Sequence, residues 1–451
     1  MRSVVPTLHE LVGSSASRTL AQVRALGVDP SDRQVRVAVV VGSSATVAQR
    51  LLATTLIDMV LRLDPLVAEV IVDSPDEDTM VADLTMRLPI VVTDVSTIVA
   101  DFSIGIGVPG HGVDLVADAA GWVAAIGTTI GAEDDGNPIG ALAGAALTAA
   151  EVFKWAFTAM YPYRSAALQL TPWTGTFSFF SYSDDGASPA LSDVRIDATL
   201  IGAGGVGAGF IRAVAALGPR VSGSLAVVDK DVLTVDNLNR VSYATLDAAL
   251  RGEQKVIEAT AFLRNYCPQL VVAPHRMTFD TFKRRIPRRE DRTYDVIVTG
   301  LDNDDARWEI QRDLPRILID GATGRDMVAR VERVEFGQYG CLGCSRVPAP
   351  AEPGQAVNCD ASPDEVAPSL SFLSAFPGIL AAGEVIKEAG ARGALRGRFD
   401  HVFRYGPNPD LAGTPGFRAD CTVGCQRPSK LAQYRRKYPS PCAPDAEDPR
   451  S

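Results

Sequence analysis

The sequence predicts an α/β protein of two doubly wound halves, the second of which carries a metal site built by cysteines. Two observations predict this fold class. The stretches 35–73 and 197–229 share one order: an apolar run, a turn of small residues, a helix-like segment and a second apolar run that ends in an acid. Two pairs of closely spaced cysteines follow in the carboxyl-terminal part of the chain. Apolar runs that alternate with helical segments are typical of parallel sheets covered by helices on both faces.

The first copy of this pattern begins with the apolar run at 35–41, and a helical segment follows over 46–63. Pro65 comes next, and the second apolar run ends at Asp73. Serine and alanine occupy the turn where the second copy has glycines, so the backbone there cannot approach a pyrophosphate closely. We therefore expect residues 1–190 to be a degenerate, Rossmann-like copy that binds ATP poorly. An unrelated accessory domain is the alternative.

The boundary between the halves is expected in the polar stretch 181–192, which is rich in Asp, Gly and Ser. A length of 451 residues suits two domains of ordinary size, 1–190 and 191–451. The most apolar stretch, 139–160, contains Glu151 and Lys154 and predicts a buried helix rather than a membrane span.

The second copy has a glycine-rich turn that contains Gly202, Gly204, Gly205 and Gly207. In such a turn the first glycine allows the tight bend, the next lets the backbone approach phosphate, and the last lets helix and strand pack closely. The amino end of the following helix offers N–H groups and a partial positive charge to phosphates. Asp229 ends the next apolar run and is placed to accept ribose hydroxyls. Alone, this pattern predicts a nucleotide site of the kind found in dehydrogenases.

Residues after Asp229 indicate chemistry at phosphate. Asn237 and Arg240 follow it, Lys255 opens another helical segment, and Asp302 ends a later apolar run. Arginine and lysine can neutralise the charge that develops on a leaving pyrophosphate, and a carboxylate can hold magnesium. A hydride-transfer enzyme has no evident need for these groups. The alternative is that Arg240 and Lys255 are surface charges and Asp302 caps the end of a strand.

From about residue 194 to 387 the chain resembles the ThiF/MoeB/ubiquitin-activating family, whose members adenylate the C-terminal glycine of a ubiquitin-like protein. The resemblance lies in the glycine turn, the acid at 229, the Asn-x-x-Arg at 237–240, Lys255 and Asp302. It implies that these residues bind ATP and that Asp302 binds magnesium. The interval between Arg240 and Lys255 is slightly longer than usual in that family.

The same resemblance implies a role for the degenerate half. Ubiquitin-activating relatives pair an inactive adenylation-like half with an active one, and small members are homodimers. In both arrangements an arginine of the partner half can reach the ATP. Arg18 is the best position for this role; Arg33 and Arg36 compete with it, and a surface arginine is the alternative.

The chain has seven cysteines and no signal-peptide-like start, so we expect cytoplasmic thiols rather than disulfides. Cys341 and Cys344 have the spacing that lets two sulfurs reach one tetrahedral zinc ion. Cys421 and Cys425 complement them, and the resemblance implies a structural zinc built from two such pairs. The second pair has three intervening residues instead of the usual two. A redox-active Cys341–Cys344 pair is the alternative.

Cys359 stands alone in a loop rich in proline and acids, before the apolar stretch 369–387. Relatives that go beyond adenylation keep a cysteine here, which attacks the acyl-adenylate and becomes a thioester or a sulfur carrier. The resemblance implies this role for Cys359. Its acidic neighbours disfavour the thiolate, so an inert loop thiol is the alternative. Cys442 is the reserve candidate, and Cys267 is expected to pack between helix and strand.

A net charge of −10 argues against nucleic acid as a general partner. Two basic segments, 283–292 and 427–437, are expected to be solvated, with a docking surface for an acidic partner as the alternative.

We expect an enzyme that uses ATP, Mg²⁺ and Zn²⁺ to activate a ubiquitin-like protein with a C-terminal glycine, with no membrane partner. The two-half arrangement favours conjugation, as in the ubiquitin-activating enzymes of bacterial antiviral operons, with a conjugating-type enzyme as a further partner. A homodimer is compatible with the sequence. The alternatives are a sulfur-carrier or peptide adenylyltransferase without a thioester step, an NAD-dependent oxidoreductase, and a non-catalytic scaffold that binds a ubiquitin-like protein.

Overall fold

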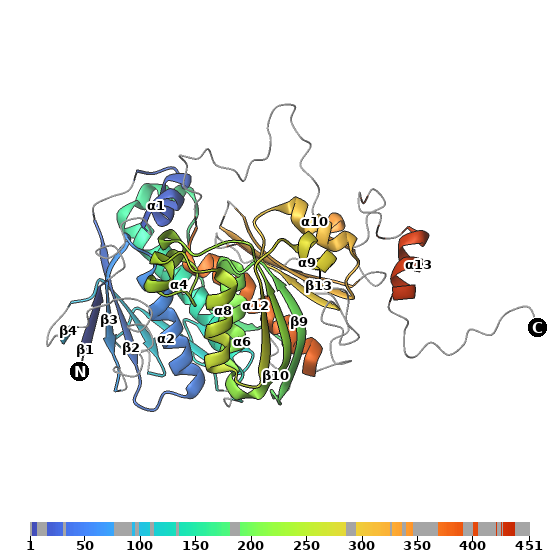
Figure 1. Cartoon of the computed structure of the whole chain (residues 1–451). Helices are drawn as coiled ribbons and strands as arrows, with labels where there is room; N and C mark the ends of the chain where they lie inside the picture. Colours follow the sequence, from blue (N-terminus) through green and yellow to red (C-terminus); the bar gives the residue numbers. More distant parts are fainter. Residues whose placement is uncertain are drawn as a thin grey trace, which may run out of the picture.

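The structure, a computed structural model, describes residues 2–6, 16–29, 33–75, 93–94, 99–108, 112–131, 135–180, 190–285, 295–324, 327–335, 340–345, 369–390, 400–404, 421, 425 and 427–437. Within them the chain forms two mixed sheets with flanking helices, consistent with two Rossmann-like halves (Figure 1). The first sheet comes from the amino-terminal half and the second from residue 194 onward.

The first sheet has the strand order β4-β1-β3-β2-β5-β6-β7-β8. Its central strands β3, β2, β5 and β6 are parallel, and antiparallel strands extend both edges. The strands are β1 (Arg2–Pro6), β2 (Val35–Val41), β3 (Val67–Asp73), β4 (Thr93–Asp94), β5 (Phe102–Ile106), β6 (Leu115–Ala120), β7 (Val123–Ile126) and β8 (Gly175–Ser178).

The helices of this half are α1 (Ala16–Ala25), α2 (Val47–Leu61), α4 (Pro138–Met160) and α5 (Pro162–Ala167). The side chain of Asn137 caps α4, and Pro138 occupies its first turn, where a missing N–H is tolerated. In the described residues α4 is the one helix long and apolar enough to cross a membrane, but 94% of its apolar window is buried inside the protein. The buried helix expected over 139–160 is therefore confirmed.

The second sheet has the order β11-β10-β9-β12-β13-β14-β15, in which the first five strands are parallel and the last two antiparallel. Its strands are β9 (Val194–Ile201), β10 (Val221–Val228), β11 (Leu270–His275), β12 (Val296–Thr299), β13 (Ile317–Gly324), β14 (Val328–Val334) and β15 (Asp400–Arg404). After β9 the chain builds β10 and β11 on one side and then β12 and β13 on the other. This reversal makes a switch point at the carboxyl end of β9, where open α/β sheets bind ligands.

Helices of the second half lie on both sides of this sheet (Figure 1). They are α6 (Gly205–Ala216), η2 (Gly218–Arg220), η3 (Val235–Asn239), α7 (Leu246–Leu250), α8 (Lys255–Tyr266), α9 (Phe279–Arg285), α10 (Asp304–Arg312), α11 (Leu342–Ser345), α12 (Ser371–Gly390) and α13 (Pro428–Lys437).

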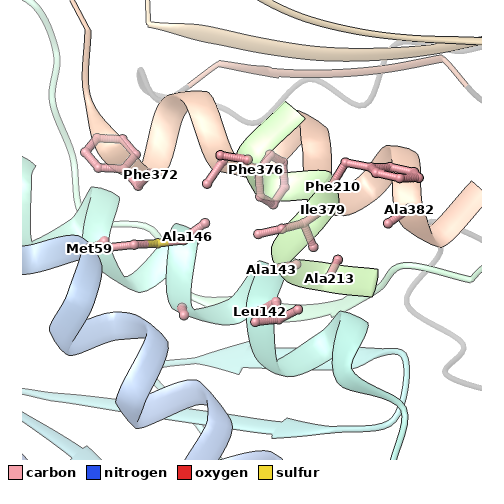
Figure 2. Close-up of a cluster of buried hydrophobic side chains, with 14 of the residues drawn as sticks. Met59, Leu142, Ala143, Ala146, Phe210, Ala213, Phe372, Phe376, Ile379 and Ala382 are labelled. Atoms are coloured by element: carbon pink, nitrogen blue, oxygen red, sulfur yellow. The ribbon is translucent and has the colours of Figure 1, made fainter. Parts of the chain in front are cut away.

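The two halves share one hydrophobic core (Figure 2). Helices α2 and α4 of the first half meet α6 and α12 of the second, and the residues labelled there are buried: Met59, Leu142, Ala143, Ala146, Phe210, Ala213, Phe372, Phe376, Ile379 and Ala382. Separating the halves would expose these side chains to water, at about 25 cal/mol for each Å² of apolar surface. The division into an inactive domain 1–190 and an active domain 191–451 stays a prediction, and residues 181–189 of the expected linker lie outside the described residues.

Helices α6 and α12 approach each other to backbone contact through two glycines. A Cβ added at Gly209 would lie 2.1 Å from the carbonyl oxygen of Ala375, and one added at Gly378 would lie 1.9 Å from that of Val206. Neither position can hold a larger residue without moving a helix backbone. This contact fixes the amino end of α12 beside the glycine turn.

Described residues of both basic segments, from 283–285 and 427–437, lie at the carboxyl end of α10. Lys437 of α13 donates to the Leu314 carbonyl at 3.0 Å, Tyr434 donates to the Arg316 carbonyl at 3.0 Å, and Lys283 of α9 lies 3.8 Å from the Asp313 carboxylate. A cation near the last carbonyls of a helix interacts favourably with its dipole. Whether this surface docks an acidic partner stays a prediction.

Candidate nucleotide site and cysteine cluster

The glycine turn lies at the switch point, between β9 and α6. Gly202 has φ +91°, which favours glycine, and an added Cβ would lie 2.7 Å from the Gly300 carbonyl oxygen at the end of β12. A Cβ at Gly207 would lie 2.1 Å from the Gly202 carbonyl oxygen, so the first turn of α6 packs directly on the loop. Around Gly204 the space is open, because nothing lies within 4 Å of an added Cβ.

Gly204 is also the amino-terminal cap of α6, and because glycine has no side chain, the cap residue makes no side-chain bond to the first N–H groups of this helix. Unpaired N–H groups at a helix start form an anion site. A Cβ added at the next residue, Gly205, would lie 3.3 Å from Cδ of Arg240 and 2.8 Å from Cβ of Ser374. The open helix end therefore has an arginine on one side and the start of α12 on the other.

The equivalent turn of the first half differs at its helix. Gly42 approaches Gly107 more closely than Gly202 approaches Gly300, since an added Cβ would lie 2.1 Å from the Gly107 oxygen. Helix α2, however, begins with a capping box, in which the Thr46 hydroxyl accepts from Gln49 N at 3.2 Å and Gln49 Oε1 accepts from Thr46 N at 2.9 Å. Gln49 also donates to Asp118 at 2.8 Å. The side chains of the first half thus close its own helix end.

Asp229 holds the glycine turn at the end of β10. Its Oδ2 accepts from Ala203 N at 2.7 Å, and its Oδ1 accepts from Asp231 N at 2.8 Å. The buried Tyr243 hydroxyl donates to the carbonyl oxygen of the same residue, Ala203, at 2.6 Å. Burial, with the charges of Asp229 and Glu258, raises the pKa of Tyr243, so this hydroxyl remains a donor. Tyr243 belongs to no motif, and sequence reasoning missed it.

Arg240 follows η3 and faces three charged groups. Burial and the charge of Arg18 lower the pKa of Arg240 to about 10, while Asp236 and Asp302 act in the opposite direction. It therefore stays charged at neutral pH. Its Nη1 donates to the Asp236 carbonyl oxygen at 3.2 Å. Arg18 and Asp236 thus lie beside Arg240, and Asp302 acts on Arg240 through its charge.

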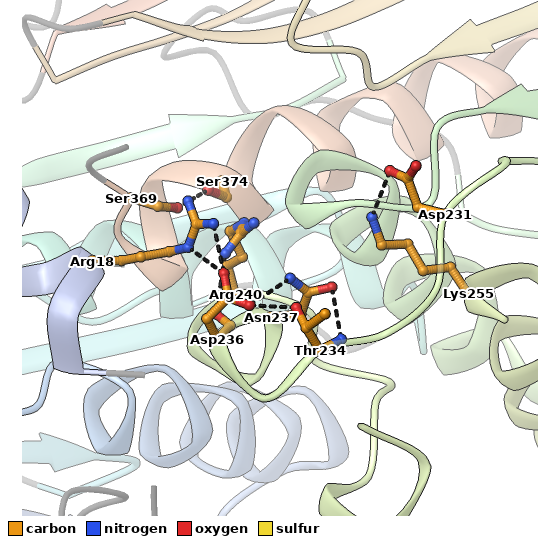
Figure 3. A network of polar contacts seen from close by, with 9 residues as sticks. All are labelled: Arg18, Asp231, Thr234, Asp236, Asn237, Arg240, Lys255, Ser369 and Ser374. Carbon is orange, nitrogen blue, oxygen red and sulfur yellow. Dashed lines mark hydrogen bonds and ion pairs between the residues drawn. The ribbon is translucent and has the colours of Figure 1, made fainter. Parts of the chain in front are cut away.

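Arg18 reaches this place from α1 in the first half (Figure 3). Its Nη2 and Nε lie 2.6 and 2.9 Å from Oδ2 of Asp236. Arg36 instead lies on β2 and pairs with Glu69 at 3.0 Å, and Arg33 is exposed. Of the three candidate arginines, Arg18 is the one that contacts the turn before Arg240.

The other predicted site residues have different surroundings. Lys255, the first residue of α8, bonds to Asp231 at 3.1 Å, and Figure 3 shows this pair apart from the arginines. Asn237 is buried and accepts from Thr234 N at 3.4 Å, so it closes its own turn. Asp302 is exposed beyond the carboxyl end of β12. The structure does not join Lys255 to Arg240 or Asp302 by an interaction.

Cysteines from both predicted pairs form one cluster. Sulfur–sulfur distances are 3.4 Å for Cys341–Cys421, 3.5 Å for Cys344–Cys425 and 4.0 Å for Cys341–Cys344, and all four sulfurs lie within 4.8 Å of one another. A tetrahedral site with Zn–S bonds of about 2.3 Å would place its sulfurs about 3.8 Å apart. The cluster therefore has the ligand atoms and spacing for a metal ion.

Neighbouring groups support the cluster. The hydrogen bond between Cys341 and Cys425 lowers the pKa of Cys425 and raises that of Cys341, so one thiol of the pair loses its proton more readily than the other. The Gln311 side chain accepts from Leu342 N at 2.8 Å and so fixes the turn between Cys341 and Cys344. Four gathered thiols fit a metal site better than the alternative of a redox-active pair.

The remaining cysteines are placed as follows. Cys267 is buried at the end of α8, where its thiol lies 3.4 Å from the Val214 carbonyl oxygen, which confirms its packing role. Cys359 and Cys442 lie outside the described residues.

Comparison with known proteins gives one family match. Residues 184–399 match the ThiF family model. No curated protein matches the chain.

Solved structures of Escherichia coli MccB are similar to the chain. One MccB structure has 17% identity and a TM-score of 0.37, and the match covers 52% of this chain and 65% of MccB, which is less than two thirds of its length. MccB with MccA has 13% identity, 69% and 98% coverage and a TM-score of 0.40. MccB with ATP has 14% identity, 68% and 97% coverage and a TM-score of 0.38. Similarity at this level does not establish a shared activity.

Proposed function

Because residues 184–399 are a ThiF family domain, we propose that the protein is an ATP-dependent adenylyltransferase that activates the terminal carboxylate of a peptide or small protein. The observation that carries the proposal is the open amino end of α6 at Gly204, with Arg240 and Arg18 beside it. An NAD site would use the same glycine turn and ribose acid but would leave two neighbouring arginines without a function.

In the proposed reaction a carboxylate oxygen of the substrate attacks the α-phosphorus of ATP. The bond from this phosphorus to the bridging oxygen of the β-phosphate breaks, and pyrophosphate leaves with the electron pair. The products are an acyl-adenylate and pyrophosphate. Positioning and charge stabilisation supply most of the catalysis in reactions at phosphorus.

The described residues have distinct roles in this proposal. The α6 amino end binds phosphate oxygens, and Asp229 orients the ribose while its carboxylate also accepts from the backbone N–H groups of Ala203 and Asp231 and so holds the loop. Arg240 and Arg18 stabilise the charge on the departing pyrophosphate. Lys255 joins them only after leaving Asp231. Asp302 would hold Mg²⁺, which neutralises phosphate charge when bound.

The proposed partner is a ubiquitin-like protein with a C-terminal glycine, in a conjugation pathway of the bacterial antiviral type. In the second step the Cys359 sulfur attacks the acyl carbon, AMP leaves, and a thioester forms. Cys359 lies outside the described residues, so the resemblance to thioester-forming relatives and the sequence position support this step.

We also propose that the four-cysteine cluster binds a structural zinc ion. Zinc would tie Cys341 and Cys344 to Cys421 and Cys425, which lie 80 and 81 positions further along the chain. Chelation should then lower the unfolding temperature, and metal analysis should find about one zinc ion per chain. A chain that is stable without metal, with no zinc after purification, would remove this part of the proposal.

The decisive test of the proposed function is ATP–pyrophosphate exchange. Wild-type protein is incubated with Mg-ATP, labelled pyrophosphate and candidate peptides or ubiquitin-like proteins that end in glycine. Substrate-dependent exchange that disappears in Arg240→Ala supports adenylation. Binding of NAD in place of Mg-ATP would overturn it.

A non-reducing gel then tests the thioester step. A thiol-sensitive adduct that is lost in Cys359→Ala and kept in Cys442→Ala supports conjugation. Exchange without an adduct would leave adenylation and refute the thioester.

A further inference from the structure

We propose that Asp236 is a positioning residue that holds Arg18 of the first half at the nucleotide site of the same chain, so that one chain completes its own site. This inference rests on the proposed function, because the ligand that Arg18 and Arg240 face is taken to be a triphosphate.

The Asp236 carboxylate divides its two oxygens between the halves (Figure 3). Oδ2 accepts hydrogen bonds from Nη2 and Nε of Arg18, at 2.6 and 2.9 Å. Oδ1 accepts from the hydroxyl of Thr234 and lies 3.5 Å from Nδ2 of Asn237, both within its own turn. The turn therefore fixes the carboxylate, and the carboxylate fixes the guanidinium.

The first half holds the η3 turn at two more points. Asn239 donates to the Thr19 hydroxyl at 3.2 Å, and the buried Arg62 guanidinium donates to the Leu238 carbonyl oxygen. Arg62 is itself paired with the buried Asp58 at 2.9 Å. Residues of α1 and of the end of α2 thus bond to successive positions of the turn that precedes Arg240.

Like charges make the position of Arg18 depend on Asp236. Arg18 and Arg240 repel each other. Burial contributes most to lowering the pKa of Arg240, and the charge of Arg18 adds to this effect, so that the pKa is about 10. Asp236 is the anion that attracts both: burial alone would raise its pKa, but the hydrogen bonds of Thr234 and Arg18 and the two arginine charges lower it. Without this carboxylate the Arg18 side chain, which is 19% exposed, has a route to solvent.

All these contacts join residues of one chain. Asp236 and Arg18 are separated by 218 positions, and the Arg18 carbonyl accepts from Ser369 N, next to α12, at 3.4 Å. Helix α1 is therefore held from η3 on one side and from the start of α12 on the other. In this arrangement the arginine comes from the chain's own first half rather than from a second subunit.

A double-mutant cycle on Mg-ATP affinity tests the positioning role without a known partner. Arg18→Ala and Asp236→Ala should each weaken calorimetric Mg-ATP binding on the order of tenfold, as expected for the loss of a hydrogen-bonded charge. The double variant should bind no more weakly than Arg18→Ala, because Asp236 acts through Arg18. Losses that multiply would overturn the positioning role.

Controls separate this role from a structural one. Asp236→Asn keeps the shape of the side chain and should still reduce affinity, while Arg24→Ala changes an exposed arginine on the same helix and should not. Unfolding temperatures of all variants should match that of wild type within a few degrees. Full affinity in Asp236→Asn would overturn the proposal.

Mixing experiments test completion within one chain. Arg18→Ala and Arg240→Ala proteins are mixed, or co-expressed, and assayed for Mg-ATP binding and pyrophosphate exchange. We expect no recovery, because neither chain has both arginines. Recovery of Mg-ATP binding or exchange would show that a second chain supplies Arg18. That result would overturn this inference and leave the proposed function standing. Absence of Mg-ATP binding in wild type would overturn the proposed function itself.

Discussion

Replacing Gly204 with alanine should leave the protein stable and weaken its binding of Mg-ATP. At this residue φ is −76° and ψ is −154°, which alanine can adopt, and an added Cβ meets nothing within 4 Å. A methyl group fits the protein there, but it would occupy the space through which a phosphate approaches the first N–H groups of α6.

The expected change in stability is close to zero because two terms oppose each other. Alanine is a poorer helix cap than glycine, at a cost of roughly 0.5 kcal/mol. It also restricts the unfolded chain, which stabilises the fold by about 0.4–1 kcal/mol. The free energy of unfolding should therefore stay within about 0.5 kcal/mol of wild type, as measured by urea denaturation.

The expected change in affinity is large. A phosphate oxygen bonded to N–H lies about 2.9 Å from nitrogen, which leaves too little room for a methyl group beside it. Forcing such a contact costs about 1–3 kcal/mol, or about 5- to 150-fold in the dissociation constant of Mg-ATP. Gly131→Ala is a matched control, because Gly131 is exposed and has equally open space. Wild-type affinity in a stable Gly204→Ala protein would refute phosphate binding at this helix end.

Three further outcomes are expected. Gly209→Ala should destabilise the protein by about 3 kcal/mol in urea denaturation, since its Cβ would lie 2.1 Å from a backbone oxygen of α12; an unchanged midpoint would contradict the close packing. Arg62→Met should cost about 3–5 kcal/mol because it removes the positive charge that pairs with the buried Asp58 carboxylate, and adding Asp58→Asn should recover part of this loss. The pKa of Asp236 is lowered from 3.8, so the stability from its pair with Arg18 is complete above that value and lost as pH falls through the lower folded pKa. The coupling free energy of Arg18 and Asp236, obtained from a double-mutant cycle in thermal unfolding, should therefore be constant from pH 8 to pH 5. A coupling free energy that falls within this range would contradict the lowered pKa.

Local pattern was sufficient to predict the elements around the glycine turn. The strand, turn, helix and strand at 35–73 and 197–229 appear as β2, α2, β3 and β9, α6, β10, because the period of apolar residues reports local structure directly. Helix α6 begins at Gly205, within the stretch that the sequence predicts as a glycine-rich turn. Glycine is a poor helix former in isolation, so composition places these residues in the loop, whereas close packing on the strand end keeps them helical.

Contacts between distant segments were beyond the sequence pattern. The ion pair of Arg18 with Asp236 depends on how the halves dock, and the bond from Tyr243 to the glycine turn joins residues 40 positions apart within the second half. Neither Asp236 nor Tyr243 lies in a motif. The pairing of Lys255 with Asp231 was likewise not predicted, because the two residues lie 24 positions apart and belong to different elements. The shared core of the halves also has no local signal.

The glycine contacts between α6 and α12 have a mechanical consequence. Where two helices touch through backbone atoms, no layer of side chains lies between them that could change rotamer and absorb a displacement. The two helices must therefore translate together, and a pull on Ser369 would be felt at Gly204 with little loss. If ATP binds at Gly204 as proposed, a group that engaged the start of α12 would therefore shift the ATP site with it.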